Sequence, residues 1–259
     1  MKKLKLLFLL PVLALSSCGM GQEVSTNFAD KYASRAVEKA PEIKAYEYIY
    51  SLKSTSGKSG DRSITSGELR MLVNENDDLY FSMSAAVDEE KETIEFYYVA
   101  NEQFGHVIYM KANIDGEKVE AAYKEDDNEY SSILSSALSE SRDAVSAQSE
   151  FSPDKIEDYV EASKEASNST SLSIKYYSKN EANLSIVVTT KSFSYVGSDT
   201  EFITNSETKI TYDNYLLKEV SASAKSNFGN RTSLRLKVNY AESYKISLPK
   251  GWEGKLAAE

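Results

Sequence analysis

The segment that most clearly indicates the fold is YEYIYSL, residues 46–52, in which large apolar side chains recur at every second position. Side chains along a β-strand point alternately to opposite faces of its sheet. The alternation therefore predicts a strand with one strongly apolar face and one face of mixed character. The same period recurs at residues 69–73 and 94–98, so we expect a sheet that buries one side.

Turn-forming residues separate these predicted strands. The pair Asp115-Gly116 lies between two alternating runs, 109–114 and 118–123, and is typical of a two-residue hairpin. The pattern predicts about six strands in a meander over residues 43–124 and about six more after residue 171, the last at 244–248. The 18 tyrosines and 4 prolines also favour extended structure.

Three segments have a helical period instead. Residues 27–40 form a weak helix that Pro41 ends, and the apolar stripe over 130–148 predicts a second. A third begins at Ser152-Pro153, where serine can cap and proline fits the first turn. The last two form a predicted helical insertion at about 127–167. Since an apolar sheet face must be covered, these amphipathic helices can serve as its cover.

The first residues have the pattern of a secretory signal. A cationic start, residues 1–5, precedes a ten-residue apolar run, 6–15. Ten residues rise only about 15 Å as a helix, which is too short for a hydrocarbon core of about 30 Å. The next residues, Leu15-Ser16-Ser17-Cys18, resemble the lipobox of bacterial lipoproteins. We therefore predict a signal peptide over 1–17, lipidation of Cys18, a tether over 18–26, one domain over 27–250 and a loosely ordered tail over 251–259.

The cysteine content and the net charge exclude or disfavour several kinds of site and partner. Cys18 is the only cysteine, so the chain can form no internal disulfide and no cysteine-based metal cluster. The net charge of −10 disfavours nucleic acid as a partner and anionic headgroups as a docking surface. We therefore expect the acyl chains to be the attachment to the membrane, on the extracytoplasmic face of a bacterial envelope.

Residues that carry enzymatic chemistry are scarce. His106 is the only histidine and has no nucleophile motif around it, so we expect a structural histidine and no metal or cofactor. Acidic residues cluster at 77–78, 88–90 and 125–127, in predicted turns, where solvated side chains are the simplest interpretation. A carboxylate hydrolase needs only two facing acids, so that alternative stays open.

The layout as a whole resembles the LolA/LppX-like family of envelope lipoproteins and lipoprotein carriers. The resemblance rests on the lipobox, the leading helix, the meander with a helical insertion, a late YDNY at 212–215 and the ending YKISLP at 244–249. It implies a mainly β, α+β fold: a curved antiparallel sheet, or half-barrel, of about 11 strands with helices covering the concave face. The family holds acyl chains in the apolar cavity beneath.

The leading hypothesis is thus a non-enzymatic, membrane-anchored lipoprotein that binds a lipid or another apolar ligand on its concave face. The alternative is a surface interaction or structural lipoprotein with a packed core and a protein partner. Whether the face is an open pocket or a filled core is not decided by the sequence. The candidate ligand-binding residues are Tyr46, Tyr48, Tyr50, Phe96 and Tyr98.

Overall fold

The structure is a computed structural model of the 259-residue chain. It describes residues 21–39, 43–56, 63–87, 90–124, 158, 171–193 and 203–256. The predicted signal peptide, Cys18 and nearly all of the predicted helical insertion lie outside the described residues. The single residue described within that insertion, Asp158, is helical.

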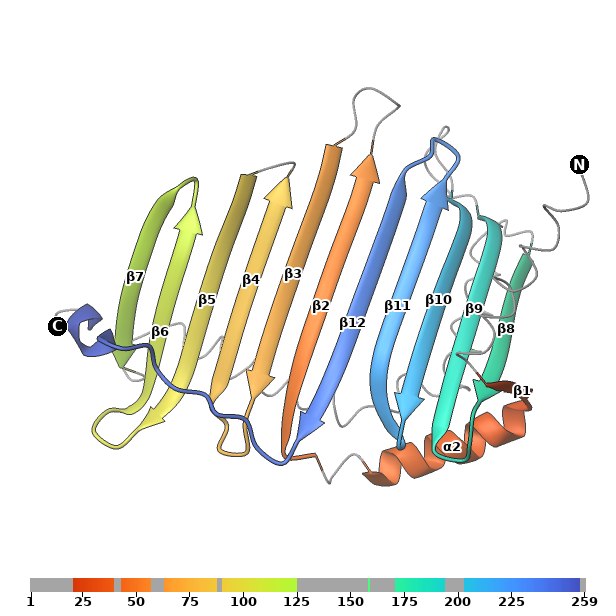
Figure 1. Cartoon of the computed structure of the whole chain (residues 1–259), viewed down its shortest axis with the longest axis horizontal. Helices are drawn as coiled ribbons and strands as arrows, with labels where there is room; N and C mark the ends of the chain where they lie inside the picture. Colours follow the sequence, from red (N-terminus) through yellow and green to blue (C-terminus); the bar gives the residue numbers. More distant parts are fainter. Residues whose placement is uncertain are drawn as a thin grey trace, which may run out of the picture.

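A single open antiparallel sheet of 12 strands dominates the molecule (Figure 1). The strands are β1 (Gln22–Val24), β2 (Ala45–Ser56), β3 (Ser63–Val73), β4 (Leu79–Val87), β5 (Glu90–Asn101), β6 (Gly105–Ile114), β7 (Glu117–Lys124), β8 (Ser171–Ser178), β9 (Asn183–Phe193), β10 (Ile203–Asp213), β11 (Leu216–Ser226) and β12 (Arg231–Ala241). Their order is β1-β8-β9-β10-β11-β12-β2-β3-β4-β5-β6-β7. The predicted curved, mainly β fold is confirmed, with 12 strands instead of about 11.

The sheet consists of two meanders joined through one edge strand of each, which pair at the centre of the sheet. The strands β2 to β7 follow one another in order, as do β8 to β12, and β12 pairs with β2 along its whole length. The predicted Asp-Gly hairpin is present between β6 and β7, where Asp115 and Gly116 have φ of 52° and 79°. Two positive φ values in succession give the turn twist that matches a β-hairpin.

Cross-strand register sorts the side chains into two faces. Tyr46 of β2 lies opposite Tyr240 of β12 and Val73 of β3, while Glu47 lies opposite Asn239 and Leu72. We call the side that carries Tyr46 the apolar face and the side that carries Glu47 the polar face. Because the pairing keeps this alternation from β8 to β7, the apolar face is continuous across the sheet.

The helix α2 (Thr26–Lys39) confirms the helix predicted from residue 27 and covers one end of the apolar face. Ser25 begins it, because its side-chain and backbone oxygens both accept from Phe28 N–H, at 3.4 and 3.0 Å. Ala29, Tyr32 and Ala36 are buried against the strands β8 to β12. The buried face is one helical stripe, as the sequence pattern requires.

Both ends of the domain are more ordered than the sequence indicates. Part of the expected tether, Gln22–Val24, forms β1 and pairs with β8. No strand forms at 244–248. Instead the chain crosses the polar face and ends in a short 3-10 helix, η4 (Trp252–Lys255) (Figure 1). Trp252 is buried there against Phe104, Tyr109 and Ala122, because the polar face is locally apolar at β6 and β7.

The turn between β3 and β4 contradicts the expectation of solvated acidic residues. Asp78 is buried, and its two carboxylate oxygens accept from Ala100 N–H at 2.7 Å and from the Asn74 amide at 2.8 Å. The Asn74 side-chain oxygen accepts from the backbone N–H groups of Asn76 and Asp78, both at 2.9 Å. The carboxylate thus ties the turn to the end of β5.

Replacing Asp78 with alanine is therefore expected to lower the free energy of unfolding by about 3 kcal/mol, because it leaves buried donors without an acceptor. Urea titration followed by circular dichroism measures the change. Glu75→Ala in the same turn is the matched control, since Glu75 is exposed and should change stability by less than about 0.5 kcal/mol. Equal effects of the two variants would contradict a structural role for Asp78.

Candidate functional site

The apolar face is buried along one end of its strands, the end at which α2 packs. Two clusters of buried side chains occupy this end, one beneath α2 and one on β2 to β6. The first is built from Ala29, Tyr32, Ala36, Tyr176, Leu184, Ile186, Ile210, Tyr212, Leu217 and Val238, and the second from Tyr46, Val73, Leu79, Tyr98 and Ile108. This half of the face is a packed core.

The other half of the same face is only partly covered. Leu52, Leu69 and Ile94 are half-buried. Toward the β7 edge four apolar side chains are exposed, and we call them the distal apolar patch: Met83 at 42%, Val87 at 54%, Ile114 at 42% and Val119 at 48%. Single exposed apolar residues are normal, but four on one face, from β4, β6 and β7, form a candidate contact surface for an apolar partner. The exposed carboxylates of Glu90, Glu92 and Glu117 lie on the same face and border this surface.

The structure places all five predicted ligand-binding residues on the apolar face, at different depths. Tyr46 and Tyr98 are buried in the second cluster, and Tyr48 and Phe96 pack against it while half-buried. Tyr50 is half-buried farther along β2. The rings of Tyr46 and Tyr48 are 5.4 Å apart in an edge-on arrangement. Tyr48, Tyr50 and Phe96 thus border the partly covered half, and their role in binding stays a prediction.

The distal apolar patch was not among the residues predicted from the sequence. Its signal was present: Phe81, Met83, Ala85 and Val87 alternate along β4, and the hairpin 114–119 has an apolar residue at each end. Alternation predicts which face such residues share. Their exposure depends on what packs over that face, which alternation does not report.

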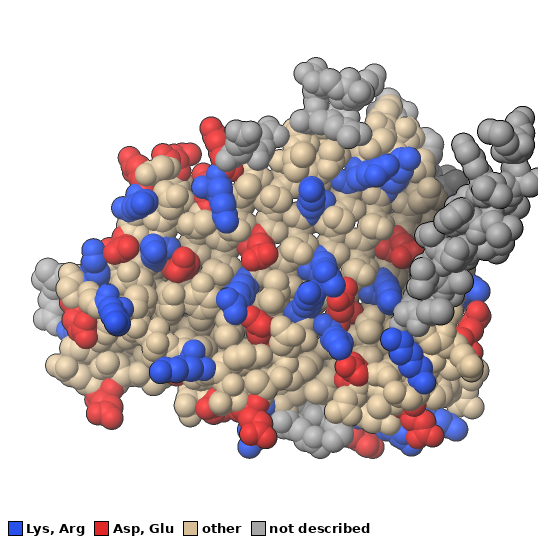
Figure 2. Space-filling view, viewed as in Figure 1, with Lys and Arg blue, Asp and Glu red and all other residues tan. Residues whose placement is uncertain are grey.

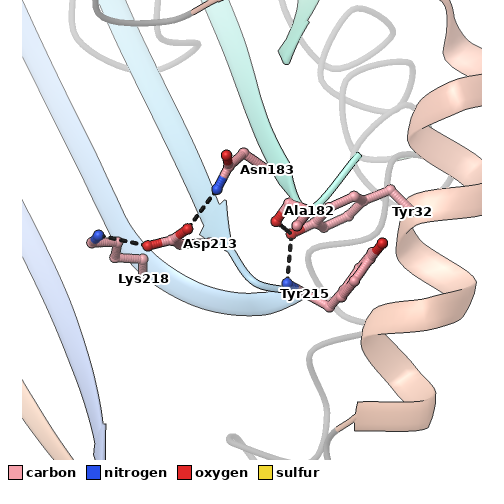
Figure 3. Close-up of polar contacts among 6 residues, drawn as sticks. All are labelled: Tyr32, Ala182, Asn183, Asp213, Tyr215 and Lys218. Carbon is pink, nitrogen blue, oxygen red and sulfur yellow. Dashed lines mark hydrogen bonds and ion pairs between the residues drawn. The ribbon is translucent and has the colours of Figure 1, made fainter. Parts of the chain in front are cut away.

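Tyr32 anchors α2 to the sheet (Figure 3). Its hydroxyl donates to the Ala182 carbonyl at 2.9 Å and accepts from Tyr215 N–H at 2.9 Å. Asn214 and Tyr215 form the tight β10–β11 turn, with φ of 52° and 65°. Beside this turn, Asp213 accepts from Lys218 Nζ at 2.8 Å, and that hydrogen bond holds the pKa of Asp213 below its usual range. The turn is therefore fixed by both a phenol and an ion pair.

Burial raises the pKa of several tyrosines on the apolar face, among them Tyr32, Tyr48, Tyr212 and Tyr240. Desolvation is the main cause in each case, because a phenolate loses its hydration inside the core. At neutral pH these phenols are uncharged, so Tyr32 can donate and accept at once. The Tyr240 hydroxyl likewise donates to the Leu217 carbonyl at 2.8 Å.

These raised pKa values predict that the fold loses stability in alkali. A tyrosine whose folded pKa lies above its unfolded value of about 10 stabilises the fold fully below pH 10, and this contribution is lost as the pH rises further. Each such group lowers the free energy of unfolding by up to about 1.4 kcal/mol per pH unit. Urea titrations at pH 8 and pH 11 measure the loss. Tyr48→Phe should reduce it, and an unchanged pH dependence in that variant would contradict the assignment.

Metal-ligating side chains do not cluster in the described residues. No group of three His, Cys, Asp or Glu lies close enough there to hold a metal ion. The ring of His106 stacks on Tyr98 with centroids 4.3 Å apart, a packed position on β6. None of the helices in the described segments is sufficiently long and apolar to cross a bilayer.

No protein-family model matches the sequence, and no curated protein matches it significantly. Solved structures give distant likenesses. LprF from Mycobacterium bovis matches 89% of this chain and 100% of its own, with 10% identity and a TM-score of 0.36. A DUF1329 family protein from Desulfovibrio piger matches 84% and 93%, with 8% identity and a TM-score of 0.23. A domain assigned as an outer membrane lipoprotein-sorting protein, from Vibrio parahaemolyticus, matches 82% and 95%, with 10% identity and a TM-score of 0.23.

Proposed function

We propose that the chain is a non-enzymatic lipoprotein, anchored by Cys18 to the outer side of a bacterial membrane, that binds a lipid or another apolar ligand on the apolar face of its sheet. The observation that carries this proposal is the unequal coverage of that face. One half is sealed by α2 and the aromatic core, while the other half keeps four large apolar side chains exposed.

The energetics favour an elongated apolar ligand. Each methylene removed from water contributes about 0.8 kcal/mol, so a chain of several methylenes laid along the distal apolar patch gains several kcal/mol. The half-buried Leu69 and Ile94 lie on the neighbouring strands and extend the contact surface toward β2. The half-buried Tyr50 lies opposite Leu69 on the same face, and tyrosine is suited to boundaries between apolar and wet surroundings.

The direct test is to purify the protein from membranes, extract it and identify bound lipid by mass spectrometry. The variant Met83→Glu places a charge between Leu69 and Ile94 at the β4 side of the patch and is expected to reduce binding of a fluorescent fatty acid by about tenfold. Ile64→Glu is the matched control, because Ile64 is also 42% exposed but lies on the polar face. It should bind as the unaltered protein does.

Two results would overturn the proposal. One is the absence of any co-purifying apolar molecule together with no binding of the fatty acid probe. The other is an equal loss of binding in Met83→Glu and Ile64→Glu, which would remove the distinction between the faces. If the patch instead captured an envelope protein and no lipid, the protein-partner alternative would be favoured.

A further inference from the structure

The polar face carries a hollow that the proposed lipid site does not use. One part, of about 630 Å3, is lined by residues of β2 and β9 to β12. A second part, of about 670 Å3, extends from there to β5. Both parts share Lys53, Glu207, Ser223 and Ser233, so they are continuous. We call the two together the polar trough.

The trough exists because small hydroxyl side chains form its floor. Ser223 lies opposite Ser233, Ser233 opposite Lys53, and Lys53 opposite Ser66, in a row that runs across the strands. The next row contains Ser221, Ser51 and Ser84. Strands are about 4.8 Å apart, so the seven spacings from β9 to β5 give a length of about 34 Å. An extended chain can lie along it.

Positive charge is concentrated at one end of the trough. Lys53, Lys191, Lys225 and Arg231 line this end with Glu207 as its single carboxylate, on a chain whose net charge is −10. Figure 2 shows this face, on which lysine and arginine side chains are spread among aspartate and glutamate side chains. Within the described segments, the side chains of Lys53, Lys225 and Arg231 form no ion pair.

Three other cations of this face have carboxylate partners close by. Arg70 pairs with Glu47 at 2.6 Å, Arg235 with Glu219 at 2.9 Å and Lys255 with Glu120 at 3.2 Å. Balanced pairs of this kind leave little net field for an anion. The basic end of the trough combines four cations with one carboxylate on a chain of net negative charge, so it suits an anionic ligand.

We propose that the polar trough binds an anionic polysaccharide, a sugar chain that carries carboxylate, sulfate or phosphate groups. Lysine and arginine at the basic end contact the anionic groups. The serine floor contacts the sugar hydroxyls, because a serine hydroxyl donates and accepts just as a sugar hydroxyl does. This inference is independent of the proposed lipid site, since the two lie on opposite faces.

The lining distinguishes a sugar chain from other polymers. An extended peptide binds by adding to a sheet edge or by filling apolar pockets, and the trough runs across the strands over a hydroxyl floor. Single-stranded nucleic acid relies on aromatic side chains for base stacking, and none lines the trough. A sugar chain needs neither an edge nor an aromatic platform to use these residues.

Titration calorimetry of the full-length protein in detergent tests the proposal with oligogalacturonate as the probe. Matched neutral maltooligosaccharide and polyglutamate serve as the comparison ligands. We expect binding of oligogalacturonate that weakens with salt, and at least about tenfold weaker binding of both other ligands. Lys225→Glu and Arg231→Glu should each weaken binding by about tenfold, while Lys118→Glu, the same charge change on β7, should not.

A further variant tests whether the shape of the trough matters independently of its charge. Ser233→Tyr fills the floor of the trough without changing the charge and should also weaken binding by about tenfold, with the unfolding temperature unchanged because Ser233 is exposed. Equal binding of polyglutamate, an equal effect of Lys118→Glu, or full binding by Ser233→Tyr would each overturn the proposal. So would the absence of oligogalacturonate binding at low salt.

Discussion

Replacing Tyr32 with alanine is expected to detach α2 from the sheet and to lower the free energy of unfolding by about 4 kcal/mol. The ring is 3% exposed, lies 5.8 Å from Tyr212 and 4.9 Å from Tyr215 between ring centroids, and belongs to the largest buried cluster. Its hydroxyl also donates to the Ala182 carbonyl and accepts from Tyr215 N–H in the tight turn. No other side chain of α2 combines these contacts in the described structure.

The conservative variant Tyr32→Phe separates the two contributions. It keeps the ring and removes both hydrogen bonds, so we expect a loss of about 1–2 kcal/mol. Urea unfolding of both variants gives the midpoints, and Lys31→Ala on the exposed side of α2 is the control. A loss below about 1 kcal/mol in Tyr32→Ala would show that α2 is not held by this residue.

Replacing Cys18 with serine is expected to move almost all of the protein from the membrane pellet to the soluble fraction. Each acyl methylene contributes about 0.8 kcal/mol to attachment, and a serine at this position carries no such chains. The acidic chain is repelled by anionic headgroups, so surface charge offers no substitute. Ultracentrifugation of cell lysates followed by immunoblotting measures the distribution.

The control for this experiment is Ser17→Ala, which keeps a small residue before the cysteine and should stay in the pellet. A Cys18→Ser protein that still sediments with membranes would contradict lipidation as the anchor. The structure adds a consequence for the anchored form. Gln22, where β1 begins, follows Cys18 by four residues, a span of at most about 14 Å. The β1 edge of the sheet should therefore lie close to the bilayer.

Local patterns in the sequence were sufficient for most of the described strands and for α2, although β1 was missed and the strand predicted at 244–248 does not form. The alternation around Tyr46 to Tyr50 lies in β2 as predicted, the Asp115-Gly116 pair makes its hairpin, and the helix after Ser25 is α2. Each of these depends on residues a few positions apart, since strand and helix periods are fixed by backbone geometry.

Pairings between distant segments could not be predicted in the same way. That β12 joins β2, that β1 joins β8 and that Trp252 covers the polar face at β6 and β7 all depend on contacts far apart in sequence. No short motif encodes them, because each is selected by the packing of the whole sheet. The burial of Asp78 beneath the end of β5 was missed for the same reason.

The same distinction between local pattern and tertiary packing applies to the candidate site. The sequence by itself determined that Tyr46, Tyr48 and Tyr50 share a face of one strand and that Phe96 and Tyr98 share a face of another, because side chains two positions apart in a strand must point the same way. The pairing through β3 and β4 places both sets on the apolar face. Only the tertiary structure decided which of them are covered. Coverage depends on where α2 docks and on how far the aromatic core extends, so Tyr46 and Tyr98 belong to the core while the patch around Met83 is exposed.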